Sequence, residues 1–257
     1  MNGRILGIAA AVEARKAAAS RVLASTAVLL VVGVTAIATA TTAAAAGGNE
    51  QLAAKLGPLA AQGGWPGLLA VADQVTAAAA VGAFGIGLSW LYGREFAEGT
   101  ITGLFALPVT RPTIALAKLA VYLLWTVVTA AVLTTTLAIA AAATFRAAPD
   151  ATAWAGLGRL LALAVMSALL PLPAAWAATL GRGLLPGIAI TAVLMVTAQI
   201  VVGASSAGAW FPFAAPALWA IQPGSTSPVQ LAVSGLVAAG FGVLTLLTWH
   251  RLQLDRT

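Results

Sequence analysis

Residues 22–46 read VLASTAVLLVVGVTAIATATTAAAA, and none of these side chains is charged. An α-helix rises 1.5 Å per residue, so about 20 apolar residues cross a hydrocarbon core about 30 Å thick. Across this and similar stretches alanine and leucine dominate, and the alternation typical of strands in an outer-membrane barrel is weak. The stretch therefore predicts a membrane-spanning helix.

Five more stretches of this kind follow along the 257-residue chain. The whole sequence is 61% hydrophobic and only 8% charged, with a mean hydropathy of +0.98, whereas a soluble domain carries about 25% charged residues. We therefore predict one all-α integral membrane domain over residues 1–257. Its six spans are predicted at residues 22–46, 67–92, 119–145, 156–180, 184–204 and 229–249.

The residues before the first span, 1–21, combine basic side chains with apolar ones at three- to four-residue spacing. This pattern predicts an amphipathic interfacial helix, with membrane lipids as its partners. A basic lead followed by an apolar run with an Ala-rich end is also typical of a cleaved signal peptide. The apolar run is longer than that of a signal peptide, which favours a retained first span.

Prolines predict two departures from straight spans. Pro171 and Pro173 lie inside the fourth span and should kink or break it, because proline lacks an amide hydrogen and its ring clashes with the preceding turn. Residues 205–228 are apolar but repeatedly interrupted by proline. We therefore expect short interfacial or re-entrant helices there, with Trp210 and Trp219 at the level of the lipid headgroups.

The basic residues favour one orientation of the spans. With the amino terminus in the cytoplasm, ten Lys and Arg residues lie in cytoplasmic segments and three in outside segments. Because cytoplasmic loops are enriched in positive charge, we predict that both termini are cytoplasmic. The ten are Arg4, Arg15, Lys16, Arg21, Arg94, Arg111, Lys118, Arg182, Arg251 and Arg256, and the three are Lys55, Arg146 and Arg159.

Composition excludes several kinds of chemistry. The chain has no cysteine and a single histidine, His250, so it offers no disulfide, no thiolate nucleophile and no Cys- or His-based metal cluster. Its three lysines lie in ARKAA, AAKLG and LAKLA, none of which is a P-loop. The net charge of +6 is spread over the span ends, so topology explains it and no nucleic acid partner is expected. We predict no catalytic residue, no metal and no cofactor in this chain.

The connection between the second and third spans, residues 93–118, is longer and more patterned than a turn. It reads GREFAEGTITGLFALPVTRPTIALAK and begins as a short amphipathic segment in which Glu95 and Glu98 are one helical turn apart and share a face. Pro108 and the following Arg-Pro pair should stop this helix and return the chain to the bilayer. Taken without any relative, charges at this position could also serve only to solvate the connection and anchor the span ends.

The same connection resembles the cytoplasmic loop of the ABC-2 type permeases. The resemblance is carried by the spacing E-x-x-E-G-T, by LPVTR and by Lys118 at the start of the next span, and more loosely by the amino-terminal VEARKAAASR and the six spans. The turn Thr110-Arg111-Pro112 departs from the family, which more often has a serine followed by a basic pair. In that family the loop forms a coupling helix that docks on the nucleotide-binding subunit.

The resemblance implies which residues carry function and which partners they meet. A separate ABC ATPase would bind ATP and Mg²⁺, and a second permease copy or a sister permease would complete the membrane part, in the plasma (inner) membrane of a bacterium. By this resemblance, coupling is assigned to Arg94, Glu95, Glu98, Gly99, Thr100, Leu107, Pro108 and Arg111, and the interfacial helix to Glu13, Arg15, Lys16 and Arg21.

Polar residues inside the spans are candidates for a substrate path, because an ionisable or amide group is costly in lipid. Asp73 and Gln74 lie in the outer part of the second span and Gln199 lies deep in the fifth. Asp73 could instead reach water near the span end, and Gln199 could instead hydrogen-bond a neighbouring helix. Arg159 fits an interfacial anchor, or a site for a lipid phosphate or an anionic substrate.

These observations favour the permease subunit of an ABC transporter that exports a hydrophobic or amphipathic substrate such as a drug, antibiotic, lipid or glycan. A stand-alone secondary transporter or channel is the alternative, although such proteins usually place several charged groups near the midplane and often show inverted repeats. An intramembrane enzyme would need a cluster of catalytic side chains, and no span contains one.

Overall fold

The fold is described by a computed structural model, in which residues 3–47, 63–204 and 206–253 are placed. Most of the first predicted outside loop, with Lys55, and the end of the tail, with Arg256, lie outside the described residues. The elements are α1 (Gly3–Ala18), α2 (Arg21–Ala46), α4 (Gly64–Ala97), α5 (Ile101–Phe105), α6 (Arg111–Phe145), α7 (Ala151–Leu169), α8 (Leu172–Leu180), α9 (Leu184–Ala204), the 3-10 helix η1 (Ser206–Trp210), α10 (Ala215–Ile221) and α11 (Pro228–Arg251).

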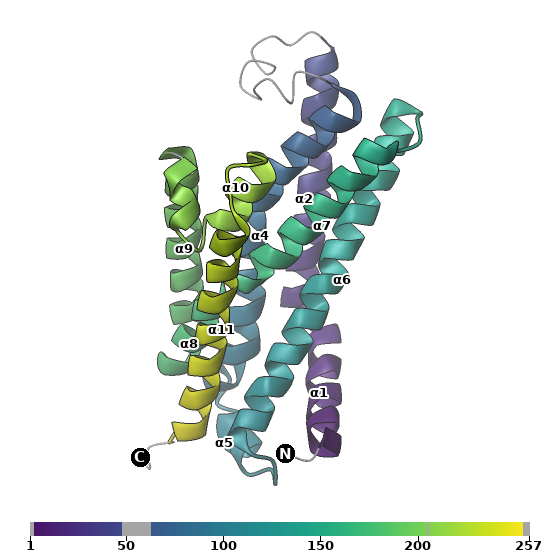
Figure 1. Ribbon diagram of the computed structural model, residues 1–257. Helices are drawn as coiled ribbons and strands as arrows, with labels where there is room; N and C mark the ends of the chain where they lie inside the picture. Colours follow the sequence, from purple (N-terminus) through teal and green to yellow (C-terminus); the bar gives the residue numbers. More distant parts are fainter. Residues whose placement is uncertain (1–2, 48–62, 205, 254–257) are drawn as a thin grey trace.

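The described chain is an elongated bundle of helices with no strand (Figure 1). Six helical units are long and apolar enough to cross a membrane: α2, α4, α6, the pair α7 and α8, α9, and α11. Both ends of the chain lie at the same end of the bundle (Figure 1). The predicted all-α integral membrane fold with six spans is confirmed.

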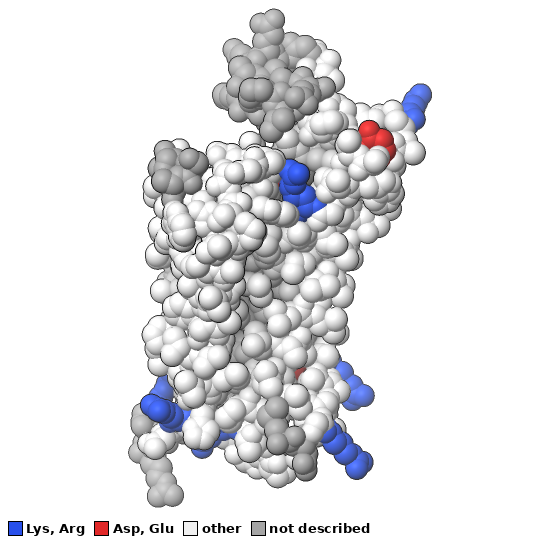
Figure 2. All heavy atoms as spheres, in the orientation of Figure 1, with Lys and Arg blue, Asp and Glu red and all other residues white. Residues whose placement is uncertain are grey.

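On the face drawn in Figure 2, the charged side chains of the described residues gather at the two ends of the bundle. Figure 2 shows blue spheres mainly at the lower end, where the termini lie, and a smaller charged group at the upper end, with an uncharged band between them. Among the described residues, nine of the ten basic residues expected in the cytoplasm lie in segments that meet at the lower end. The band is the part of the surface that suits hydrocarbon.

Local signals in the sequence explain several helix ends. The Ser20 hydroxyl caps α2 by accepting from the Leu23 amide at 3.2 Å, and Asp150 caps α7 by accepting from the Ala153 amide at 2.7 Å. The fourth span is interrupted between α7 and α8 at Pro171. The break predicted there is present because proline cannot continue the hydrogen-bonding pattern.

α4 is the central helix, because it contacts α2, α6, α7, α8, α9 and α10. Small residues allow this: a Cβ added to Gly82 would lie 3.1 Å from the Met195 sulfur, and one added to Gly85 would overlap Thr191. Both neighbours belong to α9. This glycine seam therefore packs helices of one chain together.

Two helices differ from the sequence prediction. The sequence predicts a separate amphipathic segment from Arg94 onward, whereas α4 continues without interruption to Ala97. The sequence also predicts the third span from residue 119, whereas α6 begins at Arg111 with Pro112 in its first turn, a position that proline favours. The connection proper is therefore short, residues 98–110, and holds only the five-residue helix α5.

The amino-terminal helix α1 packs against α6 and runs largely along the long axis of the bundle, below α2 (Figure 1). This is not the arrangement of a helix lying flat across the end of the bundle. Its apolar residues Ile5, Ile8 and Val12 are exposed, whereas Glu13 is buried. Glu13 is turned inward because it makes an ion pair with Lys118 of α6, and Lys16 of its own helix makes a second.

Candidate functional site

The connection at residues 98–110, which we call the coupling loop, lies at the end of the bundle where the termini lie (Figure 1). Glu98 ends α4, and Gly99 follows with a φ of 68°. A left-handed residue after a helix end is a position that glycine occupies at low cost. The chain then forms α5 and an extended turn that leads into α6.

Much of the coupling loop faces away from the bundle. Of the predicted coupling residues, Glu98, Gly99, Thr100, Leu107 and Pro108 are exposed, and Leu107 has an exposed fraction of 52%. Glu98 forms an ion pair with Arg94 at 3.5 Å, and half of its side chain is exposed. An exposed leucine beside a proline and a carboxylate is a surface that a partner protein could bind.

Glu95, one helical turn before Glu98, is buried, with an exposed fraction of 3%. The Lys118 ammonium of α6 donates to Glu95 Oε1 at 2.6 Å and to the Leu91 carbonyl at 2.9 Å. The two glutamates predicted to share a face thus differ in their surroundings. Glu98 is exposed, whereas Glu95 is paired with Lys118 and joins α4 to α6.

The same lysine also reaches the amino-terminal helix. Lys118 Nζ lies 3.0 Å from Glu13 Oε2 of α1, and Lys16 of α1 lies 2.7 Å from Glu13 Oε1 and 3.6 Å from Glu95 Oε1. Lys118 itself is fully buried. We call Glu13, Lys16, Glu95 and Lys118 the ion cluster; it balances two carboxylates with two ammonium groups and joins α1, α4 and α6.

The charges of the ion cluster stabilise one another. Burial by itself raises the pKa of Glu13, but the adjacent Lys118 and Lys16 ammonium groups outweigh it and hold that pKa below its ordinary value. Glu13 therefore remains ionised in the folded protein near neutral pH. The other residues predicted for the interfacial helix, Arg15 and Arg21, are exposed and take no part in the cluster.

A second set of contacts joins the coupling loop to α11. The Trp249 ring is fully buried and meets the rings of Tyr92, Phe96 and Phe105 edge-on, with centroids 6.0 to 6.3 Å apart. The guanidinium of Arg111 lies 4.5 Å over the Phe105 ring and donates to the Leu252 carbonyl. The predicted coupling residue Arg111 therefore anchors the loop to the carboxyl-terminal segment.

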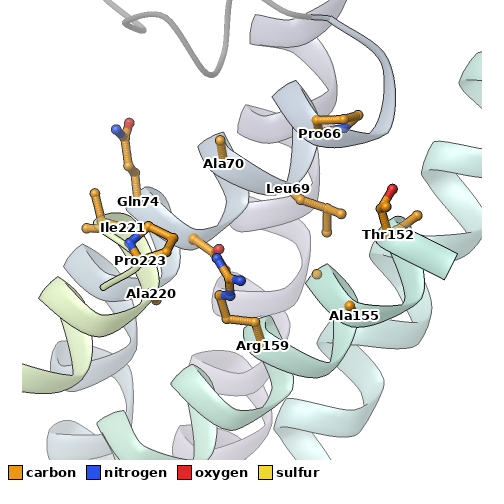
Figure 3. Close-up of a pocket in the computed structure, with 13 residues that line it drawn as sticks. Pro66, Leu69, Ala70, Gln74, Thr152, Ala155, Arg159, Ala220, Ile221 and Pro223 are labelled. Atoms are coloured by element: carbon orange, nitrogen blue, oxygen red, sulfur yellow. The ribbon is translucent and has the colours of Figure 1, made fainter. Parts of the chain in front are cut away.

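The opposite end of the bundle contains a cavity of about 490 Å³ between α4, α7 and the end of α10 with Pro223 after it. The predicted path residues Asp73 and Gln74 both line it, together with Arg159. Figure 3 shows the Arg159 side chain extending from its helix into the space between Leu69 and Pro223. The structure thus brings two of the three predicted path residues together.

Gln199, the third predicted path residue, does not line this cavity. Its amide donates to the Ala77 carbonyl of α4 at 3.3 Å, so it hydrogen-bonds a neighbouring helix. In the described ranges no three His, Asp or Glu side chains come together as metal ligands.

Two features escaped the sequence prediction. Lys118 was expected only to mark the start of a span, and Trp249 was given no role, whereas both are fully buried. Lys118 lies about two helical turns inside α6, which begins at Arg111. A lysine at such a position indicates a buried carboxylate partner, because an unpaired ammonium group is very costly inside a helix bundle. The sequence alone does not say which carboxylates serve it.

A comparison with family models finds one match, described as an ABC-2 family transporter protein, over residues 11–198. The matched residues include the ion cluster, the coupling loop and the cavity residues of α4 and α7. No curated protein matches the chain.

Proposed function

Since the chain belongs to the ABC-2 transporter family, and is therefore the membrane-spanning permease of an ABC transporter rather than its catalytic part, we propose that a separate ATPase drives it through the coupling loop. The lysines of this chain lie in no P-loop, so ATP and Mg²⁺ would bind to the separate ATPase. The surface it would contact holds Glu98, Leu107 and Pro108.

The observation that carries this proposal is the contrast within the loop between exposed and anchored residues. Its tip is exposed, whereas Phe105 within it packs on the buried Trp249 and the ion cluster joins the two helices on either side of it. A contact that transmits force needs both an accessible surface and a stiff connection to the spans. Residues 98–110 combine the two.

The ion cluster joins the helix ends that would move together under a force on the coupling loop. A push on the coupling loop moves the end of α4 and the start of α6 together, because Glu95 and Lys118 join them at 2.6 Å. Glu13 adds α1 to the same unit. We propose that these three helix ends move as one body when the ATPases close.

The remaining parts of the proposal follow from family and topology. The coupling loop would face the cytoplasm of a bacterium, with the chain in its plasma membrane, because the basic residues gather at that end. The whole chain would act as one transmembrane domain, paired with a second copy or a sister permease. Export of a hydrophobic or amphipathic compound would open a path toward the opposite end.

Photo-crosslinking tests the docking surface. A benzoylphenylalanine residue at position 107 is expected to form an adduct with a Walker-motif ATPase when native membranes are irradiated, since the Leu107 side chain is 52% exposed at the loop tip. The matched control is position 154, where Trp154 is 62% exposed at the other end of the bundle. Adducts identified by mass spectrometry give the partner directly.

A charge reversal at Glu98 tests whether this residue belongs to the docking surface. Glu98→Lys is expected to weaken the adduct at position 107 without changing membrane insertion, because Glu98 is exposed. An ATPase adduct at position 154 with none at position 107 would refute the proposed docking surface. So would a Glu98→Lys protein that crosslinks and transports like the wild type.

A further inference from the structure

The cavity of about 490 Å³ at the end opposite the termini contains two charged side chains of opposite sign, Asp73 from α4 and Arg159 from α7. Its walls are otherwise mainly apolar, with Leu69, Ile221 and Pro223 among the lining residues. Figure 3 shows Arg159 between these walls, reaching toward the centre of the cavity. Its volume lies within the range of about 300 to 1,000 Å³ that is typical of sites for small molecules.

Asp73 and Arg159 are near enough for their charges to interact, yet they form neither an ion pair nor a hydrogen bond with each other. Asp73 has an exposed fraction of 5%, and its Oδ1 accepts no hydrogen bond from any described residue. In the same described ranges Arg159 makes no hydrogen bond, and the two side chains do not form an ion pair although both line one cavity. Buried charged groups are normally paired and hydrogen-bonded, because leaving them unpaired is costly.

The buried Asp73 and the half-buried Arg159 differ in this from the buried charges of the ion cluster. In the ion cluster, each ammonium group lies within 3.0 Å of a carboxylate oxygen. Asp73 and Arg159 are held by different helices, and their helices approach closely at Gly156, where an added Cβ would lie 2.7 Å from Leu69 Cδ1. The fold therefore keeps the two groups near one another and yet unpaired, which leaves hydrogen-bonding capacity for a ligand.

We propose that this cavity binds a zwitterionic headgroup, with its phosphate or carboxylate at Arg159 and its ammonium group at Asp73. The inference rests on the proposed transport function and deepens it, because it names the class of compound that is carried. An anion alone would leave Asp73 unpaired, and a cation alone would leave Arg159 unpaired. The apolar walls suit the carbon chain attached to such a headgroup.

Binding by the purified full-length chain in an uncharged maltoside detergent tests the proposal without an ATPase. The probes are dihexanoyl phosphatidylethanolamine, which is zwitterionic, dihexanoyl phosphatidylglycerol, which has only the anion, hexylamine, which has only the cation, and free phosphoethanolamine. Calorimetry is expected to give a Kd for phosphatidylethanolamine at least about tenfold below those of the two singly charged probes, since a second charge-assisted contact is worth about that much. Equal affinities for all charged lipids would overturn the proposal.

The free headgroup distinguishes two sources of the same chemistry. If free phosphoethanolamine binds as tightly as the lipid, the cargo is a soluble zwitterion. If only the lipid binds, the cargo is an amphiphile. Both results support the charge pair as the recognition element. If neither zwitterion binds, the charge pair is not the recognition element.

Variants link the preference to the two residues. Asp73→Asn and Arg159→Gln are each expected to raise the Kd for phosphatidylethanolamine about tenfold, whereas Arg146→Gln, a matched change at an exposed arginine at the same end, should leave it unchanged. Unchanged affinity in both cavity variants would overturn the assignment. Because the comparison of probes uses the wild-type chain, it remains decisive if a variant fails to fold.

The outcome is separable from that of the proposed function. Loss of the zwitterion preference with an intact ATPase adduct at position 107 would remove the substrate assignment and leave the docking surface standing. A zwitterion preference without any ATPase adduct would support the cavity and contradict the docking surface.

Discussion

Replacing Lys118 with methionine removes the one ammonium group that three helices share. Its Nζ donates to Glu95 Oε1 at 2.6 Å, to Glu13 Oε2 at 3.0 Å and to the Leu91 carbonyl at 2.9 Å. Methionine fills a similar volume but leaves the two carboxylates buried beside the single remaining ammonium group of Lys16. Breaking a buried ion pair from one side costs about 3–5 kcal/mol, so we expect Lys118→Met to lower the free energy of unfolding by that amount.

The assay is thermal unfolding of the purified protein in detergent, followed by tryptophan fluorescence. A double-mutant cycle with Glu95→Gln isolates the pair: the double variant should be less destabilised than the sum of the single variants, because it leaves fewer unpaired charges. The matched control is Glu98→Gln, which breaks the exposed pair with Arg94 and should cost at most about 1 kcal/mol. A loss below about 1 kcal/mol for Lys118→Met, or simple additivity in the cycle, would refute the role given to the ion cluster.

Three further outcomes are expected. The pKa of Glu13 lies below its ordinary 4.5 in the folded protein. The contribution of Glu13 to stability is therefore complete above pH 4.5 and is lost as the pH falls through the lowered pKa. Glu13→Gln should flatten the fall in melting temperature below pH 4.5. Gly93→Ala should destabilise the protein, because the new Cβ would lie 2.7 Å from a backbone carbonyl of the turn before α9. The control is Gly103→Ala, whose Cβ would meet no atom within 4 Å. This change should leave the melting temperature unchanged or slightly raised. Trp249→Leu should speed hydrogen exchange in residues 98–110, because it removes three edge-on ring contacts; exchange equal to that of the wild type would contradict the anchoring of the loop.

The spans were predictable because lipid imposes a simple condition on sequence. A helix must cover about 30 Å with apolar side chains, and this condition sets the six long helices almost without reference to their neighbours. Helix ends were less predictable, because a helix can continue past its apolar span. α4 extends to Ala97 and α6 begins at Arg111, beyond the apolar residues that set the predicted spans.

The connection between α4 and α6 was predictable from the sequence, whereas the contacts of its residues were not. The charges of residues 93–118 marked the coupling loop, yet helical spacing alone grouped Glu95 with Glu98. Glu95 is buried because Lys118, 23 residues further along the chain, reaches it from another helix. Similarly, Asp73 and Arg159 were singled out separately, and only the packing of α7 on α4 places both in one cavity. Pairings between distant segments are a property of the tertiary structure, which local patterns do not encode.

The central claim is that the coupling loop faces the compartment that holds ATP. Because the chain has no cysteine, a single thiol can be placed at Leu107 in the loop or at Ala148, which is exposed in the connection between α6 and α7 at the other end. Labelling with a membrane-impermeant maleimide is expected to modify Ala148→Cys in intact cells and Leu107→Cys only in inverted membrane vesicles. Modification of Leu107→Cys in intact cells, with Ala148→Cys protected, would contradict the claim.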